Sequence, residues 1–249
     1  MRIILDRILG KSRKPSLGNN TRVYAVGDIH GRRDLFRIAM REIVDHNNGQ
    51  LAEVILLGDY IDRGPDSAGV VEDILTRPEL KDFELTCLKG NHEATLLEFL
   101  DDPGVGPSWG QYGGQETLIS YGVQPPLKKT DQDAWEACRQ AFRSTLPKAH
   151  LEFYQSLQLK AERGDYFFAH AGIDPSRSLD LQREADLLWS REKFLFDTRK
   201  AEKIIVHGHT PEEKPHRDHR RVGLDTGAYQ TGRLSVGCFS GEDVSFWTT

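Results

Sequence analysis

The stretch VYAVGDIHG (residues 23–31) joins a buried-strand pattern to two side chains that bind metals. Four consecutive apolar residues end at Gly27, and Asp28 and His30 follow at once. Near-continuous apolar runs are typical of strands that are covered on both faces. Because ligands of α/β sheets bind outside the carboxyl ends of strands, a site is expected here if other strands end in the same way.

Four further apolar runs do end in this way. They are EVILLGD (53–59), FELTCLKGN (83–91), YFFAHAG (166–172) and KIIVHGHT (203–210), and their ends supply Asp59, Asn91, His92, His170, His207 and His209. A single Asp at a strand end is usually a turn or a helix cap, and a single buried His is usually a hydrogen-bonded core residue. Five such strand ends in one chain favour a shared site.

The segments between these runs have helical patterns. Apolar residues recur with a period near 3.6 over residues 34–46, and Ser67 is a candidate cap for a helix that ends near Leu75. Alternating strands and helices predict an α/β fold with a parallel or mixed sheet. Because no repeat or linker divides the chain, we expect one domain over residues 1–249.

Residues 101–150 interrupt this alternation. We expect a loop at 101–114, two helices at 131–142 and 147–157, and a cap over the site formed by this insert. The last stretch, 221–249, has the pattern of strands joined by turns at Gly227, Gly232 and Gly241.

Composition narrows the class of protein. The 249 residues carry a net charge of −5, which argues against a general nucleic-acid binder, and no apolar run is long enough to span a membrane. Charges interrupt MRIILDRILGKSRK (1–14), so we expect no secretory signal and a segment that packs on the body. Three cysteines far apart in sequence indicate reduced thiols in a cytoplasmic protein. The basic run KPHRDHRR (214–221) is either a solvated loop or a rim that steers anions.

The types of donor at the strand ends suggest the kind of metal. Carboxylate, imidazole and amide groups without thiolate suit Mn²⁺, with Fe and Zn²⁺ as alternatives, in an open catalytic site. There are enough donors for two divalent ions, which a carboxylate can bridge. Two such ions clamp the attacking and leaving oxygens of a phosphoryl displacement.

Five short motifs together carry a resemblance to a known family. GDIHG (27–31), GDYIDRG (58–64), GNHE (90–93), HAG (170–172) and GHTP (208–211) resemble the calcineurin-like metallophosphoesterases, in the family's order. The GDYIDRG and GNHE pair is similar to the phosphoprotein phosphatase branch, which includes small bacterial and bacteriophage Ser/Thr phosphatases. The resemblance implies a four-layer α/β/β/α sandwich of two mixed sheets flanked by helices.

The resemblance also implies a metal-binding role for six of these residues. Asp28 and His30 would bind the first ion, Asp59 would bridge both ions, and Asn91, His170 and His209 would complete the second site. His207 occupies a position where the family carries an apolar strand residue. It is therefore expected either to hydrogen-bond near the ligands or to pack.

Four residues are candidates for the chemistry itself. A water that bridges two ions would lose its proton near neutral pH and attack phosphorus, and His92 would protonate the leaving oxygen. Asp62 would hold His92 in its protonated form. Arg63 is the first candidate to grip phosphate oxygens. Arg191 is the second, because WSRE (189–192) resembles a segment of the small phosphatases; Asn91 and His92 would also contact the phosphate.

The favoured activity is hydrolysis of phosphate monoesters, most of all phosphoserine and phosphothreonine in proteins, with phosphotyrosine and small aryl phosphates as further substrates. The alternative is symmetrical bis(5'-nucleosyl)-tetraphosphatase activity, although that branch shows GNHD where this chain has GNHE. A third alternative is a metal-binding scaffold without catalysis. WGQYGGQETLISYG (109–122) resembles a segment of the small phosphatases that reads W…NGG…T…YG, with Asn in place of Tyr112; a glycine-kinked loop that enters a helix is the alternative. DTGA (225–228) resembles a late family segment that forms a strand near the site, and it receives no catalytic role. The native metal, the oligomeric state and the physiological substrate stay open.

Overall fold

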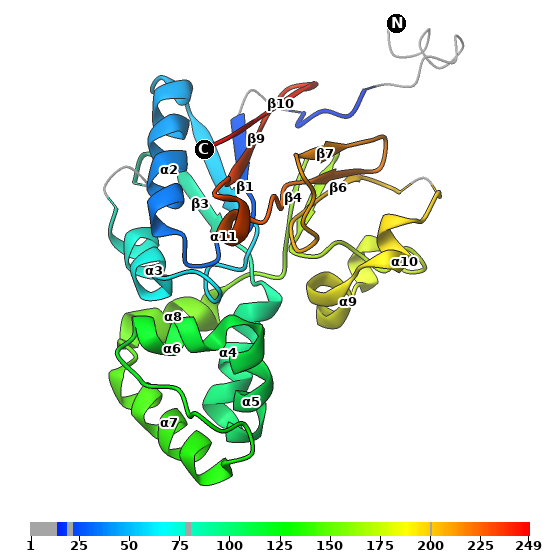
Figure 1. Ribbon diagram of the computed structural model, residues 1–249. Coiled ribbons are helices and arrows are strands. Elements are labelled where there is room, and N and C mark those ends of the chain that lie inside the picture. The colour runs from blue at the N-terminus through cyan, green and yellow to red at the C-terminus, as the bar shows by residue number, and fades with distance from the viewer. Residues whose placement is uncertain (1–13, 19–21, 78–80, 200) are drawn as a thin grey trace, which may run out of the picture.

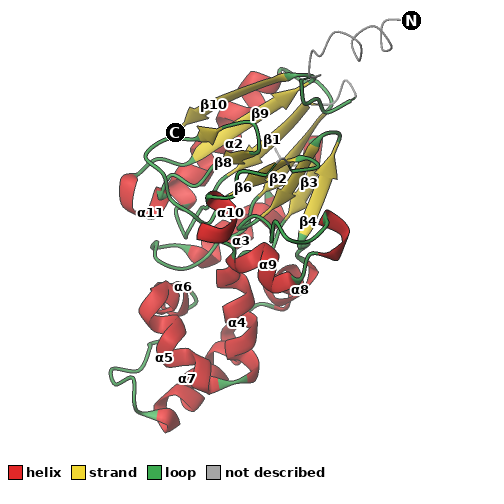
Figure 2. Ribbon diagram, turned by 90° about the vertical axis from the view of Figure 1, so that its right-hand side faces the viewer, coloured by secondary structure: helices red, strands yellow, loops and turns green. Residues whose placement is uncertain are grey.

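The computed structural model describes residues 14–18, 22–77, 81–199 and 201–249. Two five-stranded mixed sheets pack face to face, and helices cover the outer face of each sheet (Figures 1 and 2). Below the sheets in Figure 1, helices α4 to α8 form a separate layer of helices. The predicted four-layer α/β/β/α sandwich is confirmed.

The first sheet has the strand order β10-β9-β1-β2-β3. Strands β1, β2 and β3 run parallel, so their carboxyl ends share one edge, whereas β9 is antiparallel to both β1 and β10. Its strands are β1 (Arg22–Val26), β2 (Ala52–Leu56), β3 (Glu84–Cys87), β9 (Ser235–Ser240) and β10 (Asp243–Thr248).

The second sheet has the order β4-β5-β6-β8-β7. Strands β5, β6 and β8 are parallel, and the outer strands β4 and β7 pair antiparallel. Its strands are β4 (Lys160–Arg163), β5 (Tyr166–Ala169), β6 (Ile204–His207), β7 (His216–Arg217) and β8 (Arg221–Gly223).

Alternation along the strands builds three apolar cores. In β1, Val23 and Ala25 point between the sheets, while Tyr24 and Val26 face the helices of the first sheet. In β5, Phe168 points between the sheets and Phe167 faces the opposite outer layer. Because successive strand residues point to opposite faces, these apolar runs require cover on both sides.

The helices follow the strands in chain order. They are α2 (Arg33–Asn47), α3 (Ser67–Thr76), α4 (Asn91–Asp101), α5 (Gly106–Trp109), α6 (Gln115–Ser120), α7 (Gln132–Thr145), α8 (Lys148–Ser156), α9 (Glu184–Trp189), α10 (Glu192–Leu195) and α11 (Ala228–Thr231). The predicted helices at 34–46, 67–75, 131–142 and 147–157 are therefore confirmed.

Three local expectations need correction. Asp66, not Ser67, caps α3, because its Oδ1 accepts a hydrogen bond of 2.8 Å from the Gly69 N–H. Residues 101–114 form short helical turns instead of a loop, because Trp109 packs into the apolar core. The strands expected over 221–249 are present as β8, β9 and β10, but the short helix α11, which was not expected, lies between β8 and β9.

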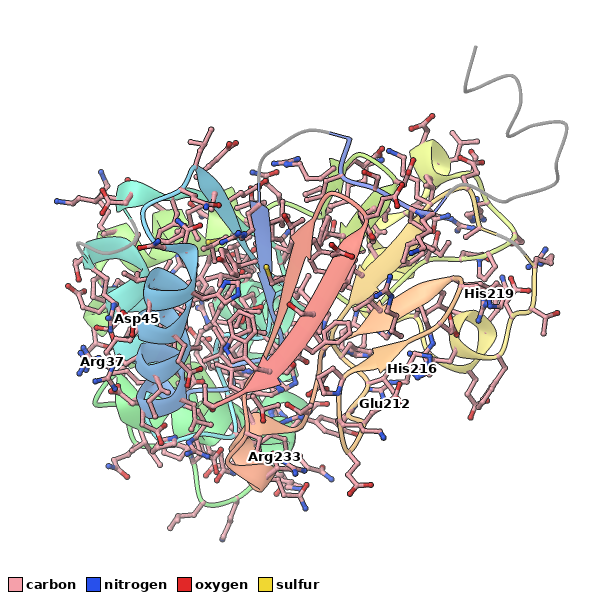
Figure 3. All side chains as sticks on the ribbon, turned by 90° about the horizontal axis from the view of Figure 1, so that it is seen from above. Arg37, Asp45, Glu212, His216, His219 and Arg233 are labelled. Carbon is pink, nitrogen blue, oxygen red and sulfur yellow. The ribbon has the colours of Figure 1, made fainter. Side chains whose placement is uncertain are left out.

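The basic run 214–221 is part of the second sheet. It contains β7, and the last two of its arginines, Arg220 and Arg221, are buried. Arg220 donates hydrogen bonds to the carbonyls of Phe194 and Leu195. His216 and His219 lie at this edge of the molecule (Figure 3). The arginines at the end of the run therefore stabilise the fold, so the run as a whole is not a solvated loop.

Three other expectations concern the chain as a whole. All three cysteines are free thiols, as expected. None of the helices among the described residues is long and apolar enough to cross a membrane. The expectations for the N-terminal segment concern residues 1–13, which lie outside the described residues.

Candidate metal centre and phosphate site

Unusual backbone geometry marks the site. Six non-glycine residues of the described chain have a positive φ between 48° and 71°, and five of them are predicted site residues: His30, Asp59, Asp62, Arg63 and His209. Such a conformation costs free energy and persists only where the surroundings enforce it. The fold therefore stores strain at the ends of β1, β2 and β6, where the predicted ligands stand.

Three predicted ligands of the second ion converge on one point. Asn91 Oδ1 lies 2.9 Å from His170 Nε2 and 2.8 Å from His209 Nδ1, and the two imidazole nitrogens are 3.2 Å apart. Asn91 begins α4, whereas His170 and His209 follow β5 and β6 of the second sheet. The two sheets thus contribute to one buried cluster.

Asp59 lies between two groups of donors. Its Oδ1 is 3.4 Å from His170 Nε2, and its Oδ2 is 3.5 Å from His30 Nε2. The far ring nitrogens of both histidines bind backbone oxygens: His30 Nδ1 contacts Ile61 O at 2.8 Å, and His170 Nδ1 contacts Leu57 O at 2.9 Å. These bonds fix each ring so that Nε2 faces the carboxylate.

Asp28, at the end of β1, is joined to this cluster through the backbone of His209. Its Oδ2 accepts a 2.9 Å hydrogen bond from the His209 N–H, and its Oδ1 is buried without a hydrogen-bond partner. A side chain at position 208 would collide with Asp28, because a Cβ there would lie 2.0 Å from Oδ1. Gly208 therefore permits the close approach of the two segments.

These donors fit divalent metal ions. Two buried groups, His30–Asp59–His92 and Asp59–His170–His209, each hold their donor atoms within 4.8 Å of one another, and all of these residues except His92 are predicted ligands. Burial lowers the pKa of His30 to about 3 and that of His209 to about 2, so both rings are neutral, as metal ligands must be. The orphaned Asp28 Oδ1 and the facing lone pairs of Asn91, His170 and His209 are the kind of unsatisfied arrangement that a cation completes.

His92 and Asp62 form a hydrogen-bonded pair beside this cluster. His92 Nδ1 lies 2.6 Å from Asp62 Oδ2, and His92 Nε2 faces the metal cluster, 3.8 Å from Asp59 Oδ2. Burial alone would lower the pKa of His92, but the charges of Asp59 and Asp62 and the hydrogen bond to Asp62 raise it to about 9. The ring is therefore protonated at neutral pH and can donate a proton from Nε2.

The two predicted phosphate-binding arginines differ in their surroundings. The Arg63 guanidinium lies 3.1 Å from His92 Nε2 and 4.9 Å from the centre of the Tyr229 ring. Arg191 is exposed between α9 and α10. Burial and His170 lower the pKa of His209, Asp59 opposes this effect, and the charge of Arg191 lowers the pKa further. Both cations border the cluster of predicted ligands.

Several residues of the site were not identified from the sequence. Glu93 accepts hydrogen bonds from the backbone N–H groups of Asp59, Tyr60 and Gly90, and so fixes the loop that carries Asp59. The Tyr229 ring packs edge-on against His30 at 5.4 Å. Glu93 is the last residue of the GNHE motif, and Tyr229 directly follows DTGA. The sequence motifs therefore pointed to both positions, although neither residue was assigned a role.

Three residues whose roles the sequence left open or unassigned, His207, Tyr112 and Asp225, lie in different surroundings. His207 packs its ring against Phe194 at 5.1 Å and places Nε2 3.1 Å from Arg221 Nη1, so it hydrogen-bonds inside the second sheet. Tyr112, which stands where the resembling segment has Asn, is 63% exposed. Asp225 of DTGA is buried. The pKa of Asp28 is raised first by the burial of Asp28 itself and next by the charge of Asp225.

Several known proteins are similar to this chain in sequence. A stretch of 160 residues is 40% identical to the zinc-dependent endopolyphosphatase of Saccharomyces cerevisiae and covers 60% of this chain but 46% of that protein. Serine/threonine-protein phosphatase 2 of Escherichia coli is 28% identical over 222 residues, which cover 86% of this chain and 90% of that one. The asymmetrical bis(5'-nucleosyl)-tetraphosphatase of Anoxybacillus flavithermus is 21% identical over 235 residues, with 85% and 87% covered.

The family itself is established by a match that extends over most of the chain. The sequence model of the calcineurin-like phosphoesterases matches residues 21–236, which include every strand from β1 to β8 and all the predicted ligands. The chain therefore belongs to the calcineurin-like phosphoesterases, in their phosphoprotein phosphatase branch, and is a metal-dependent phosphoric ester hydrolase.

Proposed function

We propose that the protein hydrolyses phosphate monoesters and that phosphoserine and phosphothreonine in proteins are its physiological substrates. The observation that carries the proposal is the His92–Asp62 pair, which presents His92 Nε2 beside Arg63 and the buried donor cluster. A monoester needs this combination, because its phosphate must be gripped and its alkoxide leaving group must receive a proton.

Six residues would hold two divalent ions in this proposal: Asp28, His30, Asp59, Asn91, His170 and His209. When bound, such ions neutralise phosphate charge and activate water for attack on phosphorus. Oxygen and imidazole donors suit Mn²⁺, and the zinc dependence in the name of the yeast relative makes Zn²⁺ the second ion to test.

The chain's own residues would carry out the other parts of the reaction. His92 would donate its Nε2 proton to the leaving oxygen, while Asp62 keeps the ring oriented and protonated. Arg63 and Arg191 would bind phosphate oxygens, with Asn91 beside them, and a guanidinium suits that task because it can donate two parallel hydrogen bonds.

Turnover of p-nitrophenyl phosphate by protein loaded with Mn²⁺ tests the proposal directly. The substitution His92→Asn is expected to reduce turnover of a phosphoserine peptide about 10²- to 10⁴-fold, because its basic leaving oxygen no longer receives a proton from the general acid. Its metal content, measured by mass spectrometry of the purified protein, should equal that of the parent. Full activity of the variant would remove His92 from this role, and an inactive metal-loaded parent would refute the monoesterase proposal.

A second candidate, bis(5'-nucleosyl)-tetraphosphatase activity of the symmetrical type, is favoured by one observation. Trp189 is 52% exposed, and its ring centre lies 6.3 Å from that of His209, so a flat aromatic surface borders the cluster. Such a surface could stack on a nucleobase. The asymmetrical tetraphosphatase of Anoxybacillus flavithermus, which acts on related substrates by its name, supports testing this class.

Parallel assays separate the two candidates. The proposal expects phosphate release from a phosphoserine peptide to exceed the cleavage of diadenosine tetraphosphate at equal substrate concentration. The substitution Trp189→Ala should then leave peptide turnover within about threefold, since phosphate binding supplies most of the affinity. A preference for the dinucleotide that Trp189→Ala abolishes would establish the second candidate instead.

A further inference from the structure

The carboxylate of Asp62 is held by donors from a part of the chain that the catalytic motifs do not include. Besides His92, it accepts a hydrogen bond from Trp109 Nε1 to Oδ2 at 2.8 Å and one from Thr117 Oγ1 to Oδ1 at 2.6 Å. Asp62 is fully buried, so these side chains replace the water that would otherwise orient it. Both donors belong to the helical insert.

The backbone around Asp62 is tied to the same segment. The Asp62 N–H lies 2.9 Å from Thr117 Oγ1 and 3.0 Å from Ser67 Oγ, and the Arg63 N–H donates to Gly113 O at 3.1 Å. Gly113 has a φ of +111°, and a Cβ there would lie 2.6 Å from Arg63 N. The insert thus holds Asp62 and Arg63 in the strained conformation with positive φ that each adopts.

Trp109 is itself rigidly held. It is 1% exposed, and its ring packs 4.9 Å from Phe99 and 6.1 Å from Phe142, which belong to α4 and α7. Its ring therefore has little freedom to move when its indole N–H holds Asp62. In Figure 1 helices α5, α6 and α7 lie below the sheets together with α4, whose second residue is His92.

We propose that Trp109 and Thr117 are positioning residues and that the insert serves to hold the proton donor in place. The inference rests on the proposed function, because it assigns them an effect on the reaction through Asp62 and His92. Loss of the indole N–H leaves Asp62 Oδ2 with one donor fewer in a buried setting. Asp62 then holds His92 less firmly, and proton delivery to the leaving oxygen weakens.

The dependence of the rate on the leaving group distinguishes this role from a general structural one. A p-nitrophenolate leaves with little help from an acid, whereas the more basic oxygen of phenyl phosphate or phosphoserine needs a proton. The substitution Trp109→Phe should lower kcat on phenyl phosphate about 10- to 100-fold and on p-nitrophenyl phosphate less than about threefold, with KM nearly unchanged.

The insert offers a matched control. Trp135 is also 1% exposed and also packs on Phe99, at 6.1 Å, but its Nε1 has no hydrogen-bond partner among the described residues. Trp135→Phe removes an indole from the same core without touching Asp62, so it should leave the ratio of the two rates unchanged. The pair Thr117→Val and Thr117→Ser gives a second test, because only Ser keeps the hydroxyl.

The outcomes separate cleanly. A selective loss with Trp109→Phe and Thr117→Val, absent from Trp135→Phe and restored in Thr117→Ser, supports the proposal. Equal losses on both substrates, or the same ratio in Trp109→Phe as in Trp135→Phe, would overturn it. A metal-loaded parent without activity on either ester would instead refute the proposed function. Far-ultraviolet circular dichroism of each variant identifies misfolded protein, and Thr117→Val then decides the test if Trp109→Phe does not fold.

Discussion

At the scale of single residues, the side chain of Tyr229 holds the guanidinium of Arg63, a predicted phosphate-binding group, in place. The Arg63 guanidinium lies over the Tyr229 ring, and that ring also packs on His30, so one tyrosine contacts a predicted metal ligand and a predicted phosphate ligand. The attraction between a guanidinium and an aromatic face amounts to about 0.5–2 kcal/mol. Removing the ring should therefore loosen Arg63 and weaken its binding of phosphate.

We expect Tyr229→Leu to raise the KM for p-nitrophenyl phosphate and the inhibition constant of inorganic phosphate about 3- to 10-fold, because Arg63 loses the surface that orients it. Steady-state kinetics with phosphate as a competitive inhibitor measure both values. Tyr229→Phe keeps the ring and should match the parent. An unchanged inhibition constant in Tyr229→Leu would show that Arg63 needs no support from this ring.

At the scale of elements, the first turn of α3 is capped by Asp66, one residue before the cap that the sequence predicted, Ser67. Asp66 caps the helix through Gly69, and its Oδ2 lies 3.2 Å from Arg33 Nη1 of α2. The loop before α3 carries Asp62 and Arg63, so the cap also fixes the end of the catalytic segment GDYIDRG.

Asp66→Ala is expected to lower the free energy of unfolding by about 1 kcal/mol, because the first turn of α3 loses the acceptor for one of its free N–H groups. Urea denaturation followed by circular dichroism measures the change. Asp66→Asn retains the capping oxygen and should lose less than Asp66→Ala. Equal stabilities of the alanine variant and the parent would contradict the assignment of the cap.

The elements that could be predicted are those whose signals are local. Apolar runs ending in Asp, Asn or His gave the five core strands and the convergence of their ends. The turns at 101–114 could not be predicted, because glycines and two prolines favour a loop there, and only the packing of Trp109 against distant helices makes them helical. For the same reason, no local pattern shows that Trp109 and Thr117 will meet Asp62, 47 and 55 residues away.

At the scale of the molecule, one ion pair joins the two sheets. Glu53 of β2 is 2% exposed, and Arg163 of β4 donates to both of its carboxylate oxygens, at 2.6 and 2.7 Å. Thr86 of β3 donates to the same carboxylate at 2.8 Å. A buried carboxylate in this position depends on its partner from the opposite sheet.

Arg163→Ala should therefore lower the free energy of unfolding by about 3 kcal/mol or more, because Glu53 is left charged and buried without its cation. Thermal unfolding monitored by calorimetry tests this. The double variant Glu53→Met with Arg163→Met removes both charges and should recover most of the loss. A single variant as stable as the parent would show that water replaces Arg163 at no cost.

The positions of the predicted ligands have a consequence for the order of folding. They range from Asp28 to His209, and they come from the edges of both sheets. Closing chain segments of this length is slow and follows local helix formation, so the pocket is assembled among the last steps. A nascent or partly refolded chain consequently lacks the geometry that captures an ion, and acquisition of metal reports that both halves have docked.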